Sequence, residues 1–378
     1  MTKKEIIKKI EEYENKISEL DKDIEQLNII QVTQKVLLNR IYGTFANKYS
    51  PFYDIDAASS ITLTGQAVIK QSSKIVNNFI KEQYGVEDDI LIYNDTDSCY
   101  ITIQPILTKL NKNFLTPDNK ISQNVYHVAK EIETHLNNEI TKWAKYNLNS
   151  HDSRFVFKRE SICDIGIFIQ KKRYILHVLD DEGIEEDKIK YVGYDVVSTA
   201  TPSKVKPLIK NIVETMVKTK NYKETNEAYK KAYEAFKNIP IEDIAFPRGI
   251  NEYEKYANMS NGLTVSKGTP IHVKSAIYYN TLLDKLSINN KYEKIKSGIK
   301  IRFFYAAPNS YSINSIGFIN QYPKEFKIEV DRNKMFKKIV ASAIERLYNV
   351  VNWRLIDPNS EAVCDLFELL AWFLLEVW

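Results

Sequence analysis

Apolar residues in the first 47 positions recur at alternating spacings of four and three, which is the spacing of a heptad repeat. This apolar seam consists of Ile6, Ile10, Tyr13, Ile17, Leu20, Ile24 and Leu27. Glu and Lys occupy many of the other positions, and neither Pro nor Gly occurs before Gly43. The pattern predicts one long helix over residues 1–47. Because such a seam needs a partner helix, by itself it is typical of a homodimeric coiled coil.

The rest of the chain alternates between helical and strand patterns. Helical periodicity predicts helices over residues 55–82, 125–147, 203–218 and 222–237. Short apolar runs predict strands at residues 90–92 and 100–103, and two more within residues 154–179, at 155–157 and 174–176. This order of helix, hairpin, helix and strand favours an antiparallel sheet backed by helices, which is an α+β fold.

The two strands nearest residue 96 enclose the polar sequence YNDTDS, at residues 93–98, which predicts a tight hairpin turn. In extended geometry Asp95 and Asp97 would point to the same side, because strand side chains alternate. Two neighbouring carboxylates repel each other unless a cation joins them, and hard oxygen ligands suit Mg²⁺. The alternative is a turn rich in Asn and Asp for purely local reasons.

Composition limits the protein class without identifying it. The chain has 378 residues, of which 44% are hydrophobic and 27% charged, as in an ordinary globular protein of two or three domains. A net charge of +4 means that any surface for a polyanion is local. Cys99, Cys163 and Cys364 fit no zinc or disulfide spacing and suit a reducing compartment. No apolar leader follows Met1, and the apolar C-terminal end is too short to cross a membrane.

Three motifs together resemble the family B DNA polymerases. Residues 93–98 resemble the YxDTDS motif of the palm, and residues 35–43 (KVLLNRIYG) resemble the K-xxx-N-S-x-Y-G helix of the fingers. Residues 171–174 (KKRY) resemble the KxY motif that contacts the primer. The runs at residues 201–202, 246–249 and 268–272 resemble thumb segments of the T-even phage type. The motifs keep the family's order, and the resemblance extends from about residue 30 to about residue 367.

The resemblance implies a polymerase active site that uses two Mg²⁺ ions. Asp97 is then the essential metal ligand and Asp95 assists it. Lys35 binds the triphosphate of the incoming dNTP and offsets the charge that develops on pyrophosphate. The other residues implied to bind the nucleotide are Asn39, Tyr42 and Gly43. The chain has Arg40 where the family has Ser, so the two nucleotide pockets differ at this position.

The same resemblance implies contacts with primer–template DNA. Lys172 and Tyr174 are expected on one strand face toward the primer, and Lys171 and Arg173 on the opposite face toward phosphate. Candidate phosphate contacts of the thumb are Lys204, Lys206, Arg248, Lys255, Lys267 and His272. Leu366 and Phe367 lie in a run that resembles the clamp-binding peptide of phage polymerases, and a helix docking on the thumb or on a partner is the alternative.

Two other features of the family are missing from the 378-residue sequence. The DxxSLYPS motif, which carries the other palm Asp, and the acidic motifs of the 3′–5′ exonuclease are absent. The expectation is therefore a C-terminal polymerase subunit with fingers at 1–54, palm at 55–190 and thumb at 191–378. A separate N-terminal subunit is expected to supply the missing Asp and to share the two ions. The alternatives are an artificial fragment of a polymerase or a decayed gene, either of which would lack the same motifs.

The rival functions are a non-catalytic module that binds primer–template DNA or a clamp, and a coiled-coil structural protein. The polymerase interpretation further implies a phage or virus gene, action in the cytoplasm of a bacterial host, and no membrane partner.

Overall fold

The computed structural model describes residues 3–152 and 154–359, and its helices and antiparallel sheets confirm the α+β class. The chain divides into two compact units, Met1–Arg159 and Glu160–Trp378. The boundary lies inside the range expected for the palm, so the division into fingers, palm and thumb stays a prediction. None of the described helices is long and apolar enough to cross a bilayer.

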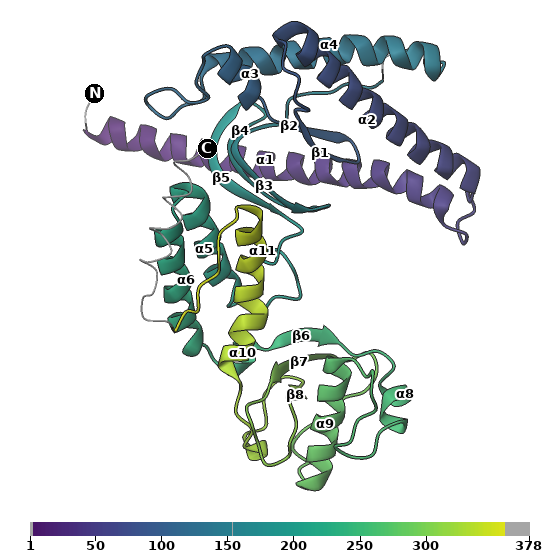
Figure 1. Ribbon diagram of the computed structural model, residues 1–378, viewed down its shortest axis with the longest axis vertical. Helices are drawn as coiled ribbons and strands as arrows, with labels where there is room; N and C mark the ends of the chain where they lie inside the picture. The colour runs from purple at the N-terminus through teal and green to yellow at the C-terminus, as the bar shows by residue number, and fades with distance from the viewer. Residues whose placement is uncertain (1–2, 153, 360–378) are drawn as a thin grey trace. The chain divides into compact units, whose positions relative to one another are not determined.

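The first unit is built on helices that flank a small hairpin (Figure 1). Its elements are α1 (Lys3–Ala46), α2 (Ile55–Tyr84), β1 (Leu91–Asp95), β2 (Ser98–Ile101), α3 (Gln104–Lys109) and α4 (Gln123–Asn147). Apolar residues of α2 and α4 form the core, among them Val76, Ile80, Val128 and Ile132. The Asp54 side chain caps α2 by accepting hydrogen bonds from the amides of Asp56 and Ala57.

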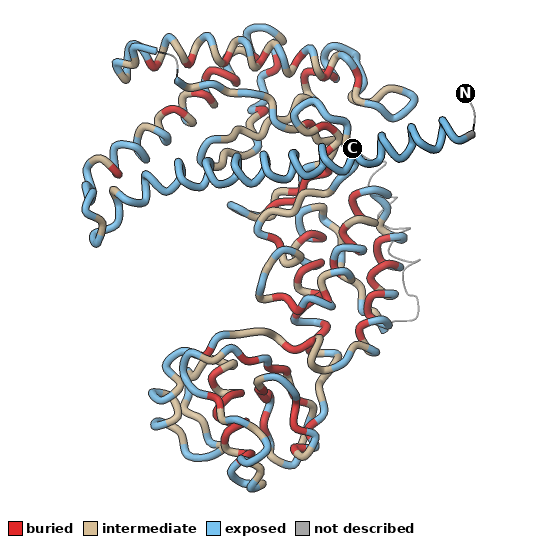
Figure 2. The backbone as a smooth tube through the Cα atoms, turned by 180° about the vertical axis from the view of Figure 1, so that it is seen from behind, coloured by how far each residue is buried: buried red, intermediate tan, exposed pale blue. Residues whose placement is uncertain are grey.

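Helix α1 confirms the long helix predicted over residues 1–47, but it buries almost nothing within its own unit. Every residue from Lys4 to Thr44 is exposed, and Figure 2 shows the helix as a continuous exposed stretch from the N-terminus. The apolar seam is 43–64% exposed along its whole length. A helix with so much exposed apolar surface gains little from tertiary packing, which is the main source of helix stability in proteins.

The second unit begins with a three-stranded antiparallel sheet in the order β3-β4-β5. Its strands are β3 (Ser161–Gln170), β4 (Arg173–Asp181) and β5 (Ile184–Val192), and the helices that follow are α5 (Lys206–Thr219) and α6 (Tyr222–Lys237). The central strand β4 is buried over most of its length. Ile167 and Ile175 of the sheet join apolar residues of α5 and α6 in one core.

Sequence patterns did not predict a second three-stranded sheet that lies farther along this unit, in the order β6-β7-β8. The region contains α7 (Ile241–Ile244), β6 (Phe246–Gly249), α8 (Tyr253–Asn258), α9 (Ile271–Lys285), β7 (Lys300–Tyr305), β8 (Ser315–Phe318) and a 3₁₀ turn at Lys324–Phe326. Helix α9 packs on β8, and Gly317 makes this approach possible because a Cβ would lie 3.3 Å from the Ser275 backbone. The chain then forms α10 (Arg332–Phe336), a π-helical turn (Lys337–Ala341) and α11 (Ser342–Val350).

One predicted strand is wrong. Residues 155–157 do not pair with another strand, because an α4 side chain satisfies their backbone instead. Asn137 Nδ2 donates to the carbonyl oxygen of Phe157 at 2.7 Å, and the Phe157 amide donates to Asn137 Oδ1 at 2.8 Å. The predicted strand at residues 174–176 and the predicted helices are confirmed within a few residues.

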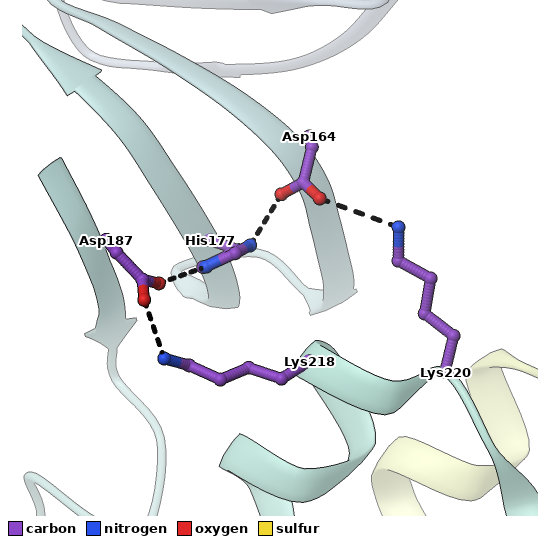
Figure 3. A network of polar contacts seen from close by, with 5 residues as sticks. All are labelled: Asp164, His177, Asp187, Lys218 and Lys220. Carbon is purple, nitrogen blue, oxygen red and sulfur yellow. Dashed lines mark hydrogen bonds and ion pairs between the residues drawn. The ribbon is translucent and has the colours of Figure 1, made fainter. Parts of the chain in front are cut away.

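A buried histidine connects the first sheet of the second unit to α5 (Figure 3). His177 of β4 is 8% exposed; its Nδ1 lies 2.6 Å from Asp164 Oδ1 and its Nε2 lies 2.8 Å from Asp187 Oδ1. Lys218 lies 2.9 Å from Asp187, and Lys220 lies 3.5 Å from Asp164. Each ring nitrogen of His177 thus faces a carboxylate oxygen, and each carboxylate is also paired with a lysine at or just after the end of α5.

Candidate active site

The acidic turn joins β1 to β2. Asp95 ends β1 and is half-buried, whereas Thr96 and Asp97 form the turn itself and are exposed. The expectation that both carboxylates project from extended backbone is wrong, since Thr96 has φ +56° and the Asp97 amide donates to the Asp95 carbonyl oxygen at 2.6 Å. Asp95 thus ends a strand and Asp97 lies in the tight turn, so the directions of their side chains do not follow from strand alternation.

Side chains of the turn brace its backbone locally. Ser98 Oγ donates to the Asp95 carbonyl oxygen at 3.1 Å, and Thr96 Oγ1 donates to Asp95 Oδ1 at 3.2 Å. Burial raises the pKa of the Cys99 thiol, which follows in β2, to about 11. At neutral pH this thiol is therefore a neutral neighbour of the acidic turn.

The acidic turn carries carboxylates of the kind that bind Mg²⁺. Asp95 and Asp97 provide hard carboxylate oxygens, which fit this ion. Within residues 3–152 and 154–359, however, no three His, Cys, Asp or Glu side chains gather as a metal-binding group. The pair thus fits a coordination sphere whose other ligands come from elsewhere, such as phosphate oxygens and a further carboxylate.

The residues predicted to bind the nucleotide lie near the C-terminal end of α1. Lys35, Asn39 and Tyr42 are spaced by four and three, so they share one face of this helix, and all are exposed. A Cβ on Gly43 would have no neighbour within 4 Å. The room beside Gly43 is therefore open on this chain.

The basic motif is arranged differently from the sequence expectation. Lys171 and Lys172 form the turn between β3 and β4, and Lys172 has φ +61°. The expectation that residues 171–174 alternate between the two faces of one strand is therefore wrong. Tyr174 is 4% exposed and its ring stacks on Phe168 with centroids 5.4 Å apart. The two lysines are exposed at the tip, whereas the tyrosine ring is part of the sheet's packing.

Among the thumb candidates, the structure brings Arg248 and His272 together. Both are half-buried, and burial together with the nearby Arg248 charge lowers the pKa of His272. Lys204 and Lys267 are exposed, Lys206 begins α5, and Lys255 forms an ion pair with Glu252 at 3.3 Å. Leu366 and Phe367 lie outside the described residues.

Sequence reasoning missed the polar groups of α2 that contact the hairpin. Asn94 Nδ2 donates to Ser73 Oγ at 2.8 Å, and Asn77 Nδ2 donates to Asp89 Oδ1 at 2.6 Å. The available signal was Asn94 itself, which occupies the variable position directly before the first aspartate of the motif.

Comparison with known proteins gives one family. The model of DNA polymerase family B matches residues 2–351. The DNA-directed DNA polymerase of Enterobacteria phage T4 is 24% identical over 284 residues, covering 72% of this chain and 31% of the relative. That of Escherichia phage RB69 is 26% identical over 262 residues, covering 66% of this chain and 28% of the relative.

A shorter match is the DNA polymerase beta of African swine fever virus (isolate Tick/Malawi/Lil 20-1/1983). It is 26% identical over 199 residues, which cover 50% of this chain and 15% of the relative. The chain thus spans about three tenths of the length of the two phage relatives.

Proposed function

The chain belongs to DNA polymerase family B, and on this basis we propose that it forms the C-terminal part of a DNA-directed DNA polymerase. The acidic turn is the observation on which the proposal depends, because it presents Asp95 and Asp97 at an accessible tip. The reaction adds a deoxynucleotide to a primer 3′ end and releases pyrophosphate. The phage relatives suggest a phage gene whose product acts in the cytoplasm of the host.

In this proposal, Asp97 and Asp95 hold Mg²⁺ by their carboxylate oxygens. When bound, the metal supplies charge neutralisation and activation of the primer hydroxyl. Lys35 binds the triphosphate of the dNTP and stabilises the charge that grows on the leaving pyrophosphate. Tyr42 packs against the nascent base pair, Asn39 positions the nucleotide, and Gly43 leaves room for it.

In this proposal, basic residues contact the phosphates of the duplex, including those of the primer strand. The tip lysines Lys171 and Lys172, with Arg173, are exposed or half-buried cations at the end of β3–β4. Arg248 and Lys267 serve the same purpose in the thumb, and Tyr174 supports the tip through its stacking on Phe168. Binding that rests on such phosphate contacts should weaken as salt increases.

We further infer that activity needs a second polypeptide segment, carried by an N-terminal partner subunit. Two observations support it. The acidic turn supplies two carboxylates where two-metal catalysis needs a further one, and the apolar seam of α1 is exposed along its length. The partner would supply the missing carboxylate, the exonuclease and a helix for the seam. A sliding clamp is a further proposed partner.

Primer extension tests the catalytic proposal. The chain is assayed with Mg²⁺, four dNTPs and a primed template, alone and with a polypeptide that carries the DxxSLYPS segment. We expect extension only with that partner, and a loss of at least about 10³-fold in Asp97→Asn, since a metal-binding charge is removed. Asp88→Asn, an exposed aspartate before β1, is the matched control and should keep full activity. Full activity of Asp97→Asn would exclude the proposed site.

The seam is tested separately by making Ile10, Ile17 and Ile24 polar. We expect the triple variant to lose binding to the partner polypeptide while the helix of the free chain changes little, because these residues are exposed. Size-exclusion chromatography with light scattering measures the assembly. A homodimer of the chain alone that the triple variant abolishes would instead support the coiled-coil structural protein.

A further inference from the structure

The hairpin that carries the acidic turn has little packing of its own. No residue of β1 or β2 is fully buried, and within residues 3–152 and 154–359 no third strand pairs with this two-stranded ladder. A two-stranded hairpin is only marginally stable in water. The ladder also shifts register between Leu91 and Tyr93, which bends β1 below the turn. Something outside the hairpin must therefore determine where Asp95 and Asp97 lie.

One polar side chain of α2 contacts β1, and a second contacts the segment just before it, so the two contacts lie on either side of this register shift. On the side of the turn, Asn94 donates to Ser73 Oγ at 2.8 Å, and Ser73 donates in turn to the Ile69 carbonyl oxygen at 2.8 Å. Two residues before β1, Asp89 Oδ1 accepts from Asn77 at 2.6 Å and from the amide of Leu91, the first residue of the strand, at 3.0 Å.

Ser73 and Asn77 are one helical turn apart, so both lie on the α2 face that meets the hairpin. Because neighbouring strand side chains alternate, holding Asn94 against α2 directs Asp95 away from α2. We propose that Ser73 and Asn77 form an anchor pair that determines the register and position of the hairpin, and thereby places the acidic turn. The consequence for catalysis rests on the proposed function, whereas the placement of the hairpin does not.

The anchor pair acts through hydrogen bonds that other groups nearby do not replace. Asn94 Oδ1 and Asn77 Oδ1 are buried and have no hydrogen-bond partner among the residues that the structure describes. Each amide therefore relies on its NH₂ group for its contact with the neighbouring element. Removing the acceptor on Ser73 would leave a second polar group of Asn94 unsatisfied, which favours movement of the hairpin away from α2.

Cys99 provides a reporter for this movement, because it lies directly across the ladder from Asn94. Cys163 of β3 is a matched internal control, since both cysteines are free and half-buried. In Ser73→Ala and Asn94→Ala we expect alkylation of Cys99 by iodoacetamide to accelerate several-fold, as read by mass spectrometry of the peptides. The rate at Cys163 should stay the same.

Ser72→Ala is the matched variant. Ser72 Oγ donates to the Val68 carbonyl oxygen at 2.9 Å, as Ser73 does to Ile69, but Ser72 is fully buried and no hydrogen bond joins it to β1. The change therefore removes the same bond within the helix without touching the hairpin. Ser73→Thr retains the hydroxyl and should restore slow labelling. Equal labelling of Cys99 in wild type and Ser73→Ala, or an equal rise in Ser72→Ala, would overturn the proposal.

The catalytic consequence is measured on the assembled polymerase. Partners of metal-binding residues typically contribute 10- to 100-fold. We therefore expect the Mg²⁺ concentration for half-maximal extension to rise roughly 10-fold or more in Ser73→Ala and to stay unchanged in Ser72→Ala. If no extension occurred even in wild type, the proposed function would fail while the labelling result would still decide on the anchor pair. Faster Cys99 labelling with an unchanged Mg²⁺ requirement would overturn the role in placing the acidic turn.

Discussion

The β1–β2 and β3–β4 hairpins, which carry two of the polymerase motifs, have similar turns but are held in place by different interactions. Each has a turn between antiparallel strands with a non-glycine residue at positive φ, Thr96 in one and Lys172 in the other. The β1–β2 hairpin has no fully buried residue and is held by side chains of α2. The β3–β4 hairpin contains the buried central strand of a three-stranded sheet. A shared turn geometry can thus be supported by polar anchoring or by a hydrophobic core.

The largest effect should come from removing core packing under the basic tip. Ile175 of β4 is 0% exposed and belongs to the core shared with α5 and α6. Ile175→Ala should lower the free energy of unfolding of the second unit by about 2–5 kcal/mol, through lost burial and the cavity left behind. Ile92→Ala in β1, at a side chain 50% exposed, should cost less than about 0.5 kcal/mol. Urea denaturation measures both, and similar losses would remove the contrast between the hairpins.

The next effect concerns the backbone that supports the basic tip. Gly193 has φ +58°, and a Cβ there would lie 2.1 Å from the Lys172 carbonyl oxygen. Gly193→Ala should therefore destabilise the sheet by about 2–3 kcal/mol and displace the tip lysines, weakening binding to primed DNA. Gly65→Ala is the control, since that glycine is inside α2 with nothing within 4 Å. It should raise stability by about 0.5–1 kcal/mol. Equal melting temperatures for the two variants would contradict this.

The histidine network predicts a smaller, pH-dependent effect on the same sheet. The hydrogen bond from His177, followed by that from Lys218, lowers the pKa of Asp187 in the folded protein. A lowered folded pKa contributes stability above the unfolded pKa, and this contribution is lost as pH falls through the folded value. Because the Asp187 side chain is 64% exposed and solvent screens its interactions, His177→Gln should cost no more than about 1 kcal/mol at neutral pH through this carboxylate, and it should reduce the loss of stability on acidification.

Urea denaturation across a pH series measures this effect of His177. All the charged groups of the network, which are Asp164, Asp187, Lys218 and Lys220, stay in place in the variant. Parallel curves for wild type and His177→Gln, separated by a constant amount at every pH, would show that the histidine contributes packing alone.

The smallest effect is expected at the acidic turn. Thr96 is a β-branched residue at φ +56°, a conformation that Asn adopts more readily. Thr96→Asn should stabilise the hairpin by less than about 1 kcal/mol, since the relief of strain is offset by loss of the 3.2 Å hydrogen bond to Asp95. Amide hydrogen exchange across residues 93–99 measures it. A clear loss of protection would indicate that the threonine hydroxyl matters more than the backbone strain.

Sequence alone predicted the local elements and the motif positions well. Helical periodicity placed α2, α4 and α6 within a few residues, because an amphipathic face is written into the spacing of apolar residues. The strand at 155–157 failed because its backbone partner is the Asn137 side chain, twenty residues earlier in the chain. The β6–β8 sheet was missed because β6 and β8 are only 4 residues long and β6 pairs with β7 across a long sequence separation.

The candidate site residues also fall into two groups, those that the sequence alone predicted and those that needed the folded structure. Asp95, Asp97 and the lysines at 171 and 172 were recognisable because their chemistry and spacing are local. That Tyr174 is buried against Phe168, and that Gly193 lies against the Lys172 backbone, depends on strands meeting in space.

The sequence by itself determined the family resemblance, the long α1 helix with its apolar seam, and the two aspartates of the acidic turn. Only the tertiary structure decided that the seam is exposed within its own unit, that Ser73 and Asn77 of α2 contact β1 and the segment before it, and that His177 lies between two carboxylates. The physical reason is the range of the interactions. Helix periodicity and turn chemistry act over a few residues, whereas burial and hydrogen bonding between elements depend on which surfaces the folded chain brings together.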